Sequence, residues 1–182
     1  FDVFNDMQDG EISISGLYND LIKGEPLNGT IKVRNFRVVN APALTHLLSI
    51  LSLTGILEAL QGDGLAFKNL EAPFELHNEV FRLDGARASG PSLGFTASGK
   101  IYNLEDQIDV EGTIVPAYAL NSAFGKLPLL GTLFTGGEKG GGVFAANYKF
   151  KGDLEDPQIS VNPLSALTPG FLRRIFDIFD DS

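Results

Sequence analysis

The sequence contains no cysteine and only two histidines among its 182 residues. Without cysteine the chain forms no disulfide, offers no thiolate to a metal and has no cysteine nucleophile. Two histidines alone do not make a credible transition-metal site, so we expect no metal and no other cofactor. The redox compartment stays open, because a cysteine-free chain suits the bacterial envelope as well as the cytosol.

Positive charge is also scarce. The chain has 14 Lys+Arg against 23 Asp+Glu, a formal net charge of -9. A nucleic-acid partner would require a basic stripe, so we expect no nucleic-acid binding. An anionic bilayer surface would repel such a chain, and any contact with lipid must therefore be made through apolar surface.

The length of the chain is that of a single domain with a sizeable core. We expect residues 1–182 to form one domain cut from a longer protein, because the sequence starts at Phe1 without an initiator Met. The longest uncharged run lies between Arg37 and Glu58 and contains several polar residues. This composition favours a buried or groove-lying helix over a membrane span.

Apolar and polar residues alternate along most of the chain, which predicts strands with one dry and one wet face. Ile31 and Val33 alternate with Lys32 and Arg34, and the phase flips at Asn35, which predicts a β-bulge. The same alternation marks residues 11–15, 74–77, 81–84, 93–102, 108–114, 144–150 and 159–161.

Short polar turns separate these strands, at Asn78, at Gly90-Pro91 and at Glu105-Asp106. Turns of this length favour hairpins and therefore an antiparallel sheet. About eight to ten strands are too many for a flat sheet, because twist accumulates from strand to strand. We expect a mainly β fold, a curled antiparallel sheet with a few short amphipathic helices.

Three apolar segments are predicted to be helical. The first runs over 42–60, with Asn40 as its cap, a kink at Gly55 and an end at 62–64. The second, over 117–134, is broken at Pro128 and Gly131. The third begins after a capping Thr168 and carries one apolar stripe, formed by Phe171, Leu172, Ile175, Phe176 and Phe179.

These helices can cover the dry face of the sheet in two ways. They either fill the concave side completely, as an ordinary core, or cover it in part and leave a trough. The small residues Ala97, Gly99, Gly112 and Ala146 on the dry face favour a trough slightly, whereas composition alone favours a filled core. The third helix likewise either docks on the sheet or enters a membrane interface, and its terminal aspartates favour docking.

Sequence motifs for catalysis are weak. Residues 90–94, GPSLG, match G-x-S-x-G, but a strand pattern follows Ser92 where a nucleophile elbow needs a helix. Residues 94–100 resemble a phosphate-binding loop, but Ile101 stands where the magnesium-binding hydroxyl is required. The acidic groups near both 153–156 and 177–181 lack calcium-loop spacing. We therefore expect a protein that is not an enzyme.

Several stretches resemble the C-terminal region of AsmA-like envelope proteins of Gram-negative bacteria, the superfamily that includes TamB and YhdP. They are GTIKVRNFRVVNAPALTHLLSILSLTGILEALQGDGLAFKNLEAPFEL, RASGPSLGFTASGKIYNLEDQIDVEG and the segment from GTIVPAYALNSAFG to TPGFLRRIF. The resemblance covers nearly the whole chain from about residue 29. It consists of glycine, proline and apolar spacing and includes no catalytic signature.

The resemblance implies a long, rolled β-groove in the periplasm, anchored in the inner membrane through a segment outside this sequence. Such proteins are thought to pass phospholipids to the outer membrane. This family thus favours a trough that holds acyl chains, with phospholipid and the rest of its own longer chain as partners. The dry-face residues expected to contact lipid are Ile31, Val33, Phe74, Leu76, Phe81, Leu83, Leu93, Phe95, Ile101, Ile108, Val110 and Phe144.

The third helix, with Phe171, Leu172, Ile175, Phe176 and Phe179, becomes on this hypothesis an end-cap or a contact with the outer membrane. An alternative function is a scaffold that assists outer-membrane protein assembly, in which the open edge of the sheet pairs with an outer-membrane β-barrel partner.

Overall fold

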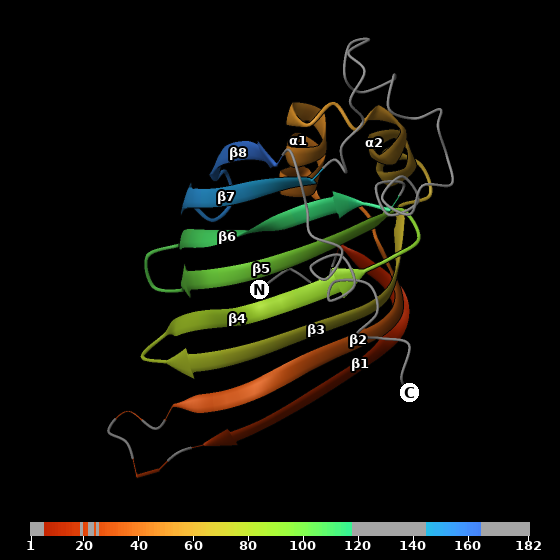
Figure 1. The fold of residues 1–182 in the computed structure, drawn as a ribbon. Helices are drawn as coiled ribbons and strands as arrows, with labels where there is room; N and C mark the ends of the chain where they lie inside the picture. The colour runs from red at the N-terminus through yellow and green to blue at the C-terminus, as the bar shows by residue number, and fades with distance from the viewer. Residues whose placement is uncertain (1–5, 19, 22–23, 25, 118–144, 165–182) are drawn as a thin grey trace.

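The alternating segments of the sequence form one continuous sheet. The computed structural model describes residues 6–18, 20–21, 24, 26–117 and 145–164. Its elements, in chain order, are β1 (Met7–Tyr18), β2 (Leu27–Val38), α1 (Pro42–Ile50), α2 (Thr54–Gln61), β3 (Leu65–His77), β4 (Val80–Ser89), β5 (Leu93–Tyr102), β6 (Gln107–Pro116), β7 (Ala145–Asp153) and β8 (Gln158–Leu164). The strands lie side by side in this same order (Figure 1).

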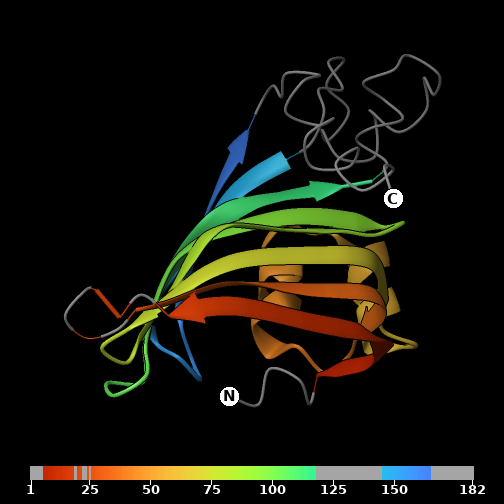
Figure 2. The same cartoon turned by 90° about the horizontal axis from the view of Figure 1, so that it is seen from below.

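Every neighbouring pair of strands is antiparallel, from β1–β2 through to β7–β8. The sheet is not closed into a barrel, so β1 and β8 are its two edges. Figure 2 shows the sheet curling, with α1 and α2 on its concave side. The predicted fold class, a curled antiparallel sheet with a few short helices, is confirmed.

The turn predicted at Asn78 closes the β3–β4 hairpin. His77 pairs with Val80, which leaves a two-residue loop. Both loop residues have positive φ, 50° at Asn78 and 62° at Glu79. Two left-handed residues define the type I′ turn, whose twist matches that of the flanking strands. Asparagine tolerates this conformation well, which is why the sequence marks the turn clearly.

The phase flip predicted at Asn35 is present, but it is not a β-bulge. Arg34 pairs with Asn69 and Phe36 pairs with Phe67, so one residue lies between the two pairs on each strand and neither strand has an extra residue. Asn35 instead has a positive φ of 51°. Val33 and Phe36 both reach the core although they are three residues apart. The irregularity therefore keeps the dry face apolar on both sides of Asn35.

The first predicted helix is in fact two helices, and the predicted kink at Gly55 was wrong. The chain turns at Ser52, whose φ is 55°, between the end of α1 and the start of α2. The N–H of Leu53 donates to the carbonyl of Leu48, and that of Ser52 to the carbonyl of Ser49. These are the two bonds of a Schellman motif, which ends a helix with a left-handed residue. Serine is uncommon at this left-handed position, so the sequence did not indicate that the helix ends there.

The predicted cap at Asn40 was wrong as well. Asn40 itself is left-handed, with φ of 51°. The cap position belongs to Ala41, and α1 has no side-chain cap. Pro42 starts α1 without needing an N–H partner. Among the described residues we find no helix that could serve as a membrane span.

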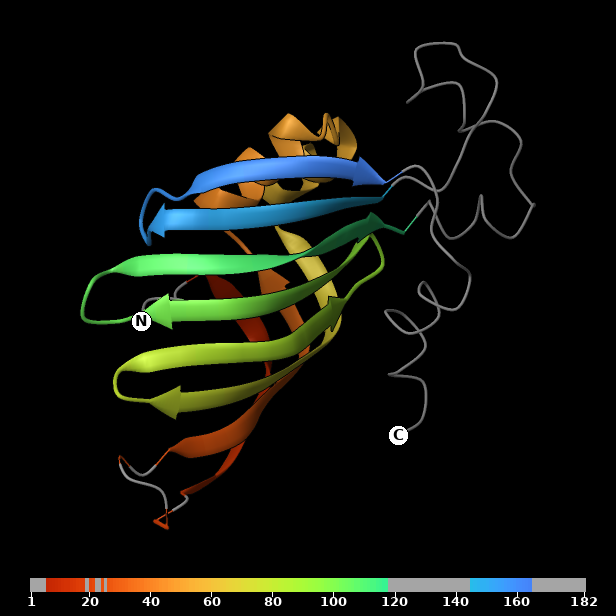
Figure 3. The same ribbon diagram turned by 60° about the vertical axis from the view of Figure 1, so that its left-hand side comes forward.

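Both helices lie along one side of the concave face, with α1 against β8 and α2 against β3 (Figure 3). Their apolar residues form the main core together with inward residues of β2 to β7. The core residues from the two helices and the link between them are Leu47, Leu48, Leu51, Leu53, Ile56 and Leu60.

Two further predictions lie outside the described residues. They are the second helix, beyond residue 117, and the third helix after Thr168. The predicted contact residues that also lie outside the described residues are Phe144, Phe171, Leu172, Ile175, Phe176 and Phe179. Their proposed roles remain predictions.

Candidate functional site

Strand pairing places the predicted dry-face residues in rows that cross the sheet. One row runs near the β3–β4 and β5–β6 turns, because Leu27 pairs with Leu76, Leu76 with Phe81 and Phe81 with Ile101. Ile101 in turn pairs with Ile108. Directly paired residues in antiparallel strands point to the same face, so this row is apolar across five strands.

A second row runs beside the first. Phe74 pairs with Leu83, and Val110 pairs with Phe150, which pairs with Ile159. Together the two rows form a surface that we call the apolar track. Its members are Leu27, Phe74, Leu76, Phe81, Leu83, Ile101, Ile108, Val110, Phe150 and Ile159.

The apolar track is only partly buried. Eight of its ten side chains keep intermediate exposure, whereas Phe74 is 8% and Val110 5% exposed. The rings of Phe74 and Phe81 stack with centroids 5.1 Å apart. From β2 to β8 the track crosses six strand spacings, about 29 Å at ~4.8 Å each. One leaflet of hydrocarbon is about 15 Å thick, so the track is long enough for an extended acyl chain.

The other half of the concave face is a filled core. Val33 and Leu93, both predicted to contact lipid, are each only 1% exposed and lie in one cluster with Leu48 and Ile56 of the helices. Phe95 is partly buried against the same cluster. The expectation of a filled core therefore holds for the half under the helices. Phe150 and Ile159, at one end of the apolar track, also pack against this core. The rest of the track extends beside the core with mostly half-buried side chains.

Small residues form the floor between these halves. Ala72, Ala86 and Ala97 cluster with Val110, and Ile31 packs against them as well as against the helix-covered core. Alanine side chains occupy little volume above the sheet, so the concave face has less side-chain bulk between the helix-covered core and the apolar track. The predicted residue Ile31 thus lies at the boundary between the core and the apolar track.

Tyr148 brings a polar group onto the concave side. Its hydroxyl donates a hydrogen bond of 2.7 Å to the backbone carbonyl of Thr96, two strands away. The bond passes over Gly112 of the intervening strand. A Cβ on Gly112 would collide with that carbonyl oxygen and lie 2.7 Å from the hydroxyl. Only glycine therefore permits this bond, and burial raises the pKa of Tyr148.

The Tyr148 bond coincides with a break in strand pairing. Pairs of β5 and β6 run to Phe95–Ile114 and resume at Ser98–Glu111. Between them, the N–H of Thr113 donates to the Thr96 hydroxyl at 3.1 Å. The Thr96 side chain and the Tyr148 hydroxyl thus satisfy backbone groups at this break. Sequence reasoning missed this arrangement, since nothing local links residues 52 positions apart.

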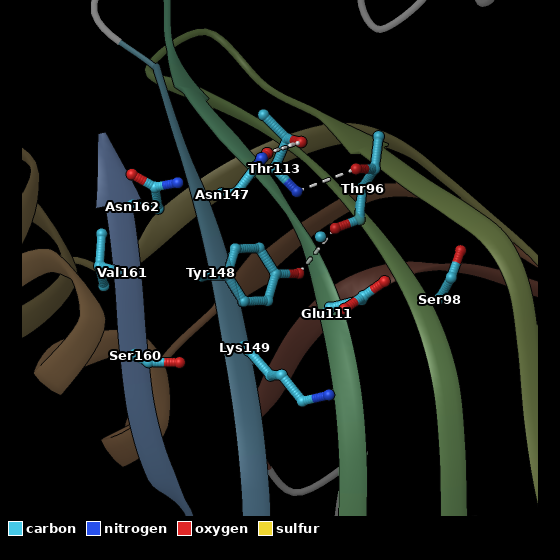
Figure 4. Close-up of a pocket in the computed structure, with 11 residues that line it drawn as sticks. Thr96, Ser98, Glu111, Thr113, Asn147, Tyr148, Lys149, Ser160, Val161 and Asn162 are labelled. Atoms are coloured by element: carbon cyan, nitrogen blue, oxygen red, sulfur yellow. Dashed lines mark hydrogen bonds between the residues drawn. The ribbon is translucent and has the colours of Figure 1, made fainter. Parts of the chain in front are cut away.

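A polar cavity of about 420 Å³ lies over the same strands (Figure 4). It is lined mainly by the wet face of β5 to β8. The Thr113 hydroxyl donates to the Asn147 side-chain oxygen at 2.8 Å, so some polar groups of the lining are already paired. Its hydroxyl, amide and charged groups, from Thr96, Ser98, Glu111, Thr113, Asn147, Lys149, Ser160 and Asn162, do not suit a hydrocarbon chain.

Charged side chains populate the wet face in cross-strand pairs. Lys149 lies 2.7 Å from Asp109, and Lys32 lies 3.5 Å from Glu71. The hydrogen bond between Lys149 and Asp109 lowers the pKa of the carboxyl and raises that of the ammonium. Such exposed pairs contribute little stability. They keep this face in water and leave the apolar track as the main candidate for ligand binding.

The catalytic sequence match and the metal-ligating residue types can be placed within the described residues. Ser92 of the G-x-S-x-G match lies in the β4–β5 turn and is followed by strand β5, as expected. Among the residues that the structure describes, no group of three His, Asp or Glu side chains is close enough to hold a metal.

Three members of the apolar track were not among the predicted contacts, namely Leu27, Phe150 and Ile159. The alternation around Phe150 and Ile159 was visible in the sequence. Only the register of β7 and β8 placed them beside Val110.

Comparison with known proteins identifies the chain by family. The sequence model of the YhdP protein family matches residues 13–159. Neither a search of curated proteins nor one of solved structures gives a significant match.

Proposed function

This chain belongs to the YhdP protein family, and we propose that it is a module of a bridge-like lipid transport protein. In this proposal the apolar track holds phospholipid acyl chains on their way between inner and outer membrane. The module is the C-terminal part of a longer periplasmic protein that is tethered to the inner membrane.

The observation that carries this proposal is the apolar track. It joins two apolar rows across the sheet and keeps eight of ten side chains partly exposed. Each CH₂ group transferred from water to such a surface contributes about 0.8 kcal/mol. A phospholipid can thus be held by area alone while its headgroup stays in water. The module needs no catalytic group, and we propose that it is not an enzyme.

Lipid contact can be tested with a photo-crosslinking amino acid placed on either face. Phe81 lies on the apolar track, and Tyr102 lies on the opposite face of the neighbouring strand. Both are aromatic and partly exposed, so the same benzophenone side chain replaces either one with similar disturbance. In protein purified from a bacterial host, we expect phospholipid adducts at position 81 and few at position 102.

Native mass spectrometry of the unmodified protein gives an independent measurement. We expect bound phospholipid masses that disappear after delipidation. Equal crosslinking at positions 81 and 102, together with no copurifying phospholipid, would refute lipid binding by the apolar track.

The edge of the sheet supports a second function, assembly of outer-membrane proteins. Strand β1 is 12 residues long, and among the strands that the structure describes it pairs with β2 alone. It contains neither proline nor lysine, the residues that commonly protect an edge. Ile12 and Ile14 are 50% and 61% exposed there. An added strand would cover them, whether it comes from a β-barrel partner or from the rest of the longer chain.

Crosslinking along β1 separates these possibilities. Residues Ser13 and Ser15 lie on this edge strand, and a crosslinker there should capture a protein. A barrel protein captured at these positions supports the assembly role, whereas capture of lipid alone contradicts it.

A further inference from the structure

The α1–α2 pair covers its half of the concave face with apolar side chains, and an acyl chain would likewise cover it with hydrocarbon. Leu48, Leu53 and Ile56 are buried against inward sheet residues. The covered surface is continuous with the uncovered one, because Ile31 and Leu70 pack against both the helix-covered core and the alanine floor. Hydrocarbon and the helix pair are therefore alternative covers for one continuous apolar surface.

Arg37 makes polar contacts between the sheet and the link that follows the helix pair. Arg37 on β2 donates from Nη1 to the carbonyls of Asp63 and Gly64, at 3.2 and 3.3 Å. These carbonyls belong to the link between α2 and β3. The left-handed residues Asn40 and Gly64, with φ of 51° and 82°, stand at the entry to and exit from the pair. Both links thus turn sharply immediately beside the sheet.

The helices also depend on the surface that they cover. They contain nine and eight residues, and isolated helices of such length are marginal in water. Neither has a side-chain cap at its start. Their position is therefore set chiefly by apolar contact, which a bound lipid would offer as well.

We propose that lipid binding displaces the α1–α2 pair from the concave face of the sheet. Without lipid the helix pair covers its half of this face, and with lipid bound the acyl chains cover that half instead. A ligand shifts such an equilibrium only by binding one state better, and the displaced state offers the acyl chains more apolar surface. This inference rests on the proposed lipid-carrying function, and Arg37 acts in it as a latch.

Spin labels can measure the displacement, since the chain has no native cysteine. Ser49 on α1 and Gln107 at the start of β6 are both exposed. A Ser49→Cys, Gln107→Cys protein is labelled, delipidated and incubated with vesicles of phosphatidylethanolamine and phosphatidylglycerol. Pulsed dipolar spectroscopy gives the distance between the labels, and native mass spectrometry of the same samples gives the lipid loading. We expect a second, displaced distance population that grows with loading.

The latch is tested with Arg37→Gln in the same labelled protein. Loss of its two hydrogen bonds should raise the ratio of displaced to docked helices about fivefold. The matched control is Arg34→Gln, an exposed arginine three residues earlier on the same strand, which should leave the ratio unchanged.

Three outcomes distinguish the proposals. Lipid-dependent displacement that increases with Arg37→Gln but not with Arg34→Gln supports the inference. Lipid loading with an unchanged single distance overturns the displacement of the α1–α2 pair and leaves the lipid-carrying function intact. Absence of any loading overturns both.

Discussion

Replacing Tyr148 with phenylalanine removes one hydroxyl and leaves the ring in place. In the folded chain this hydroxyl satisfies the Thr96 carbonyl over Gly112, and Tyr148 is only 6% exposed. A buried acceptor left without its donor costs about 1–3 kcal/mol. For a chain of this length each kcal/mol lowers the melting temperature by about 2–4 °C. We expect Tyr148→Phe to be destabilised by these amounts.

The assay is equilibrium denaturation followed by circular dichroism. Tyr102→Phe is the control, since Tyr102 is partly exposed on the opposite face of the sheet. It should change stability by less than about 0.5 kcal/mol. Equal stability of Tyr148→Phe and wild type would refute the reasoning, because the Thr96 carbonyl would then not depend on this hydroxyl.

The same residue also predicts a pH dependence. Burial raises the pKa of Tyr148 above its usual value of about 10. Above pH ~10 the unfolded chain releases a proton that the folded chain retains, so the unfolding free energy falls, by up to about 1.4 kcal/mol per pH unit. Tyr148→Phe lacks this term, and its deficit relative to wild type should shrink between about pH 9 and 11. A deficit that stays constant over this range would contradict the assigned burial.

Three further substitutions test the core, the helix break and the close approach. Leu48→Ala, at a side chain with no exposure, should cost about 2–5 kcal/mol in thermal or chemical denaturation, and a loss below 1 kcal/mol would argue against tight helix packing. Ser52→Gly should stabilise the chain by about 0.5–1 kcal/mol, because glycine adopts the left-handed φ of 55° without strain; destabilisation would contradict the Schellman assignment. Gly112→Ala should break the contact between Tyr148 and Thr96 and cost at least as much as Tyr148→Phe, and a stability equal to wild type would show that the strand can relax.

Local patterns predicted most of the sheet. The turn at Asn78 and the phase flip at Asn35 could be predicted because each involves a residue that tolerates positive φ and each interrupts the alternation of its own strand. The β-bulge expected at Asn35 was wrong, because the pairing register is the same on both sides of that residue. The break between the two helices could not be predicted from the sequence, because Ser52 adopts a left-handed conformation that glycine or asparagine usually occupies. A tertiary context that buries Leu48 and Leu53 on either side of the break overrides that preference.

The sequence predicted which residues point to the apolar face of the sheet, and the structure shows which of these residues stay partly exposed. Seven of the predicted contact residues lie in the apolar track. Val33 and Leu93 lie on the same face but are covered by the helices. The same alternation of apolar and polar residues marks the residues of the apolar track and those under the helices. No pattern within a strand therefore distinguishes a covered residue from a partly exposed one.

Alternation and turn chemistry act within a few residues, so the sequence was enough to predict that one face of each strand is apolar and that neighbouring strands are antiparallel. Which half of that face stays open follows only from the packing of the folded chain. This outcome depends on where α1 and α2 come to rest against β3 and β8. It also depends on a Tyr148 bond that spans 52 residues of chain. Such long-range contacts are set by the packing of the whole sheet and leave no periodic signal in any one segment.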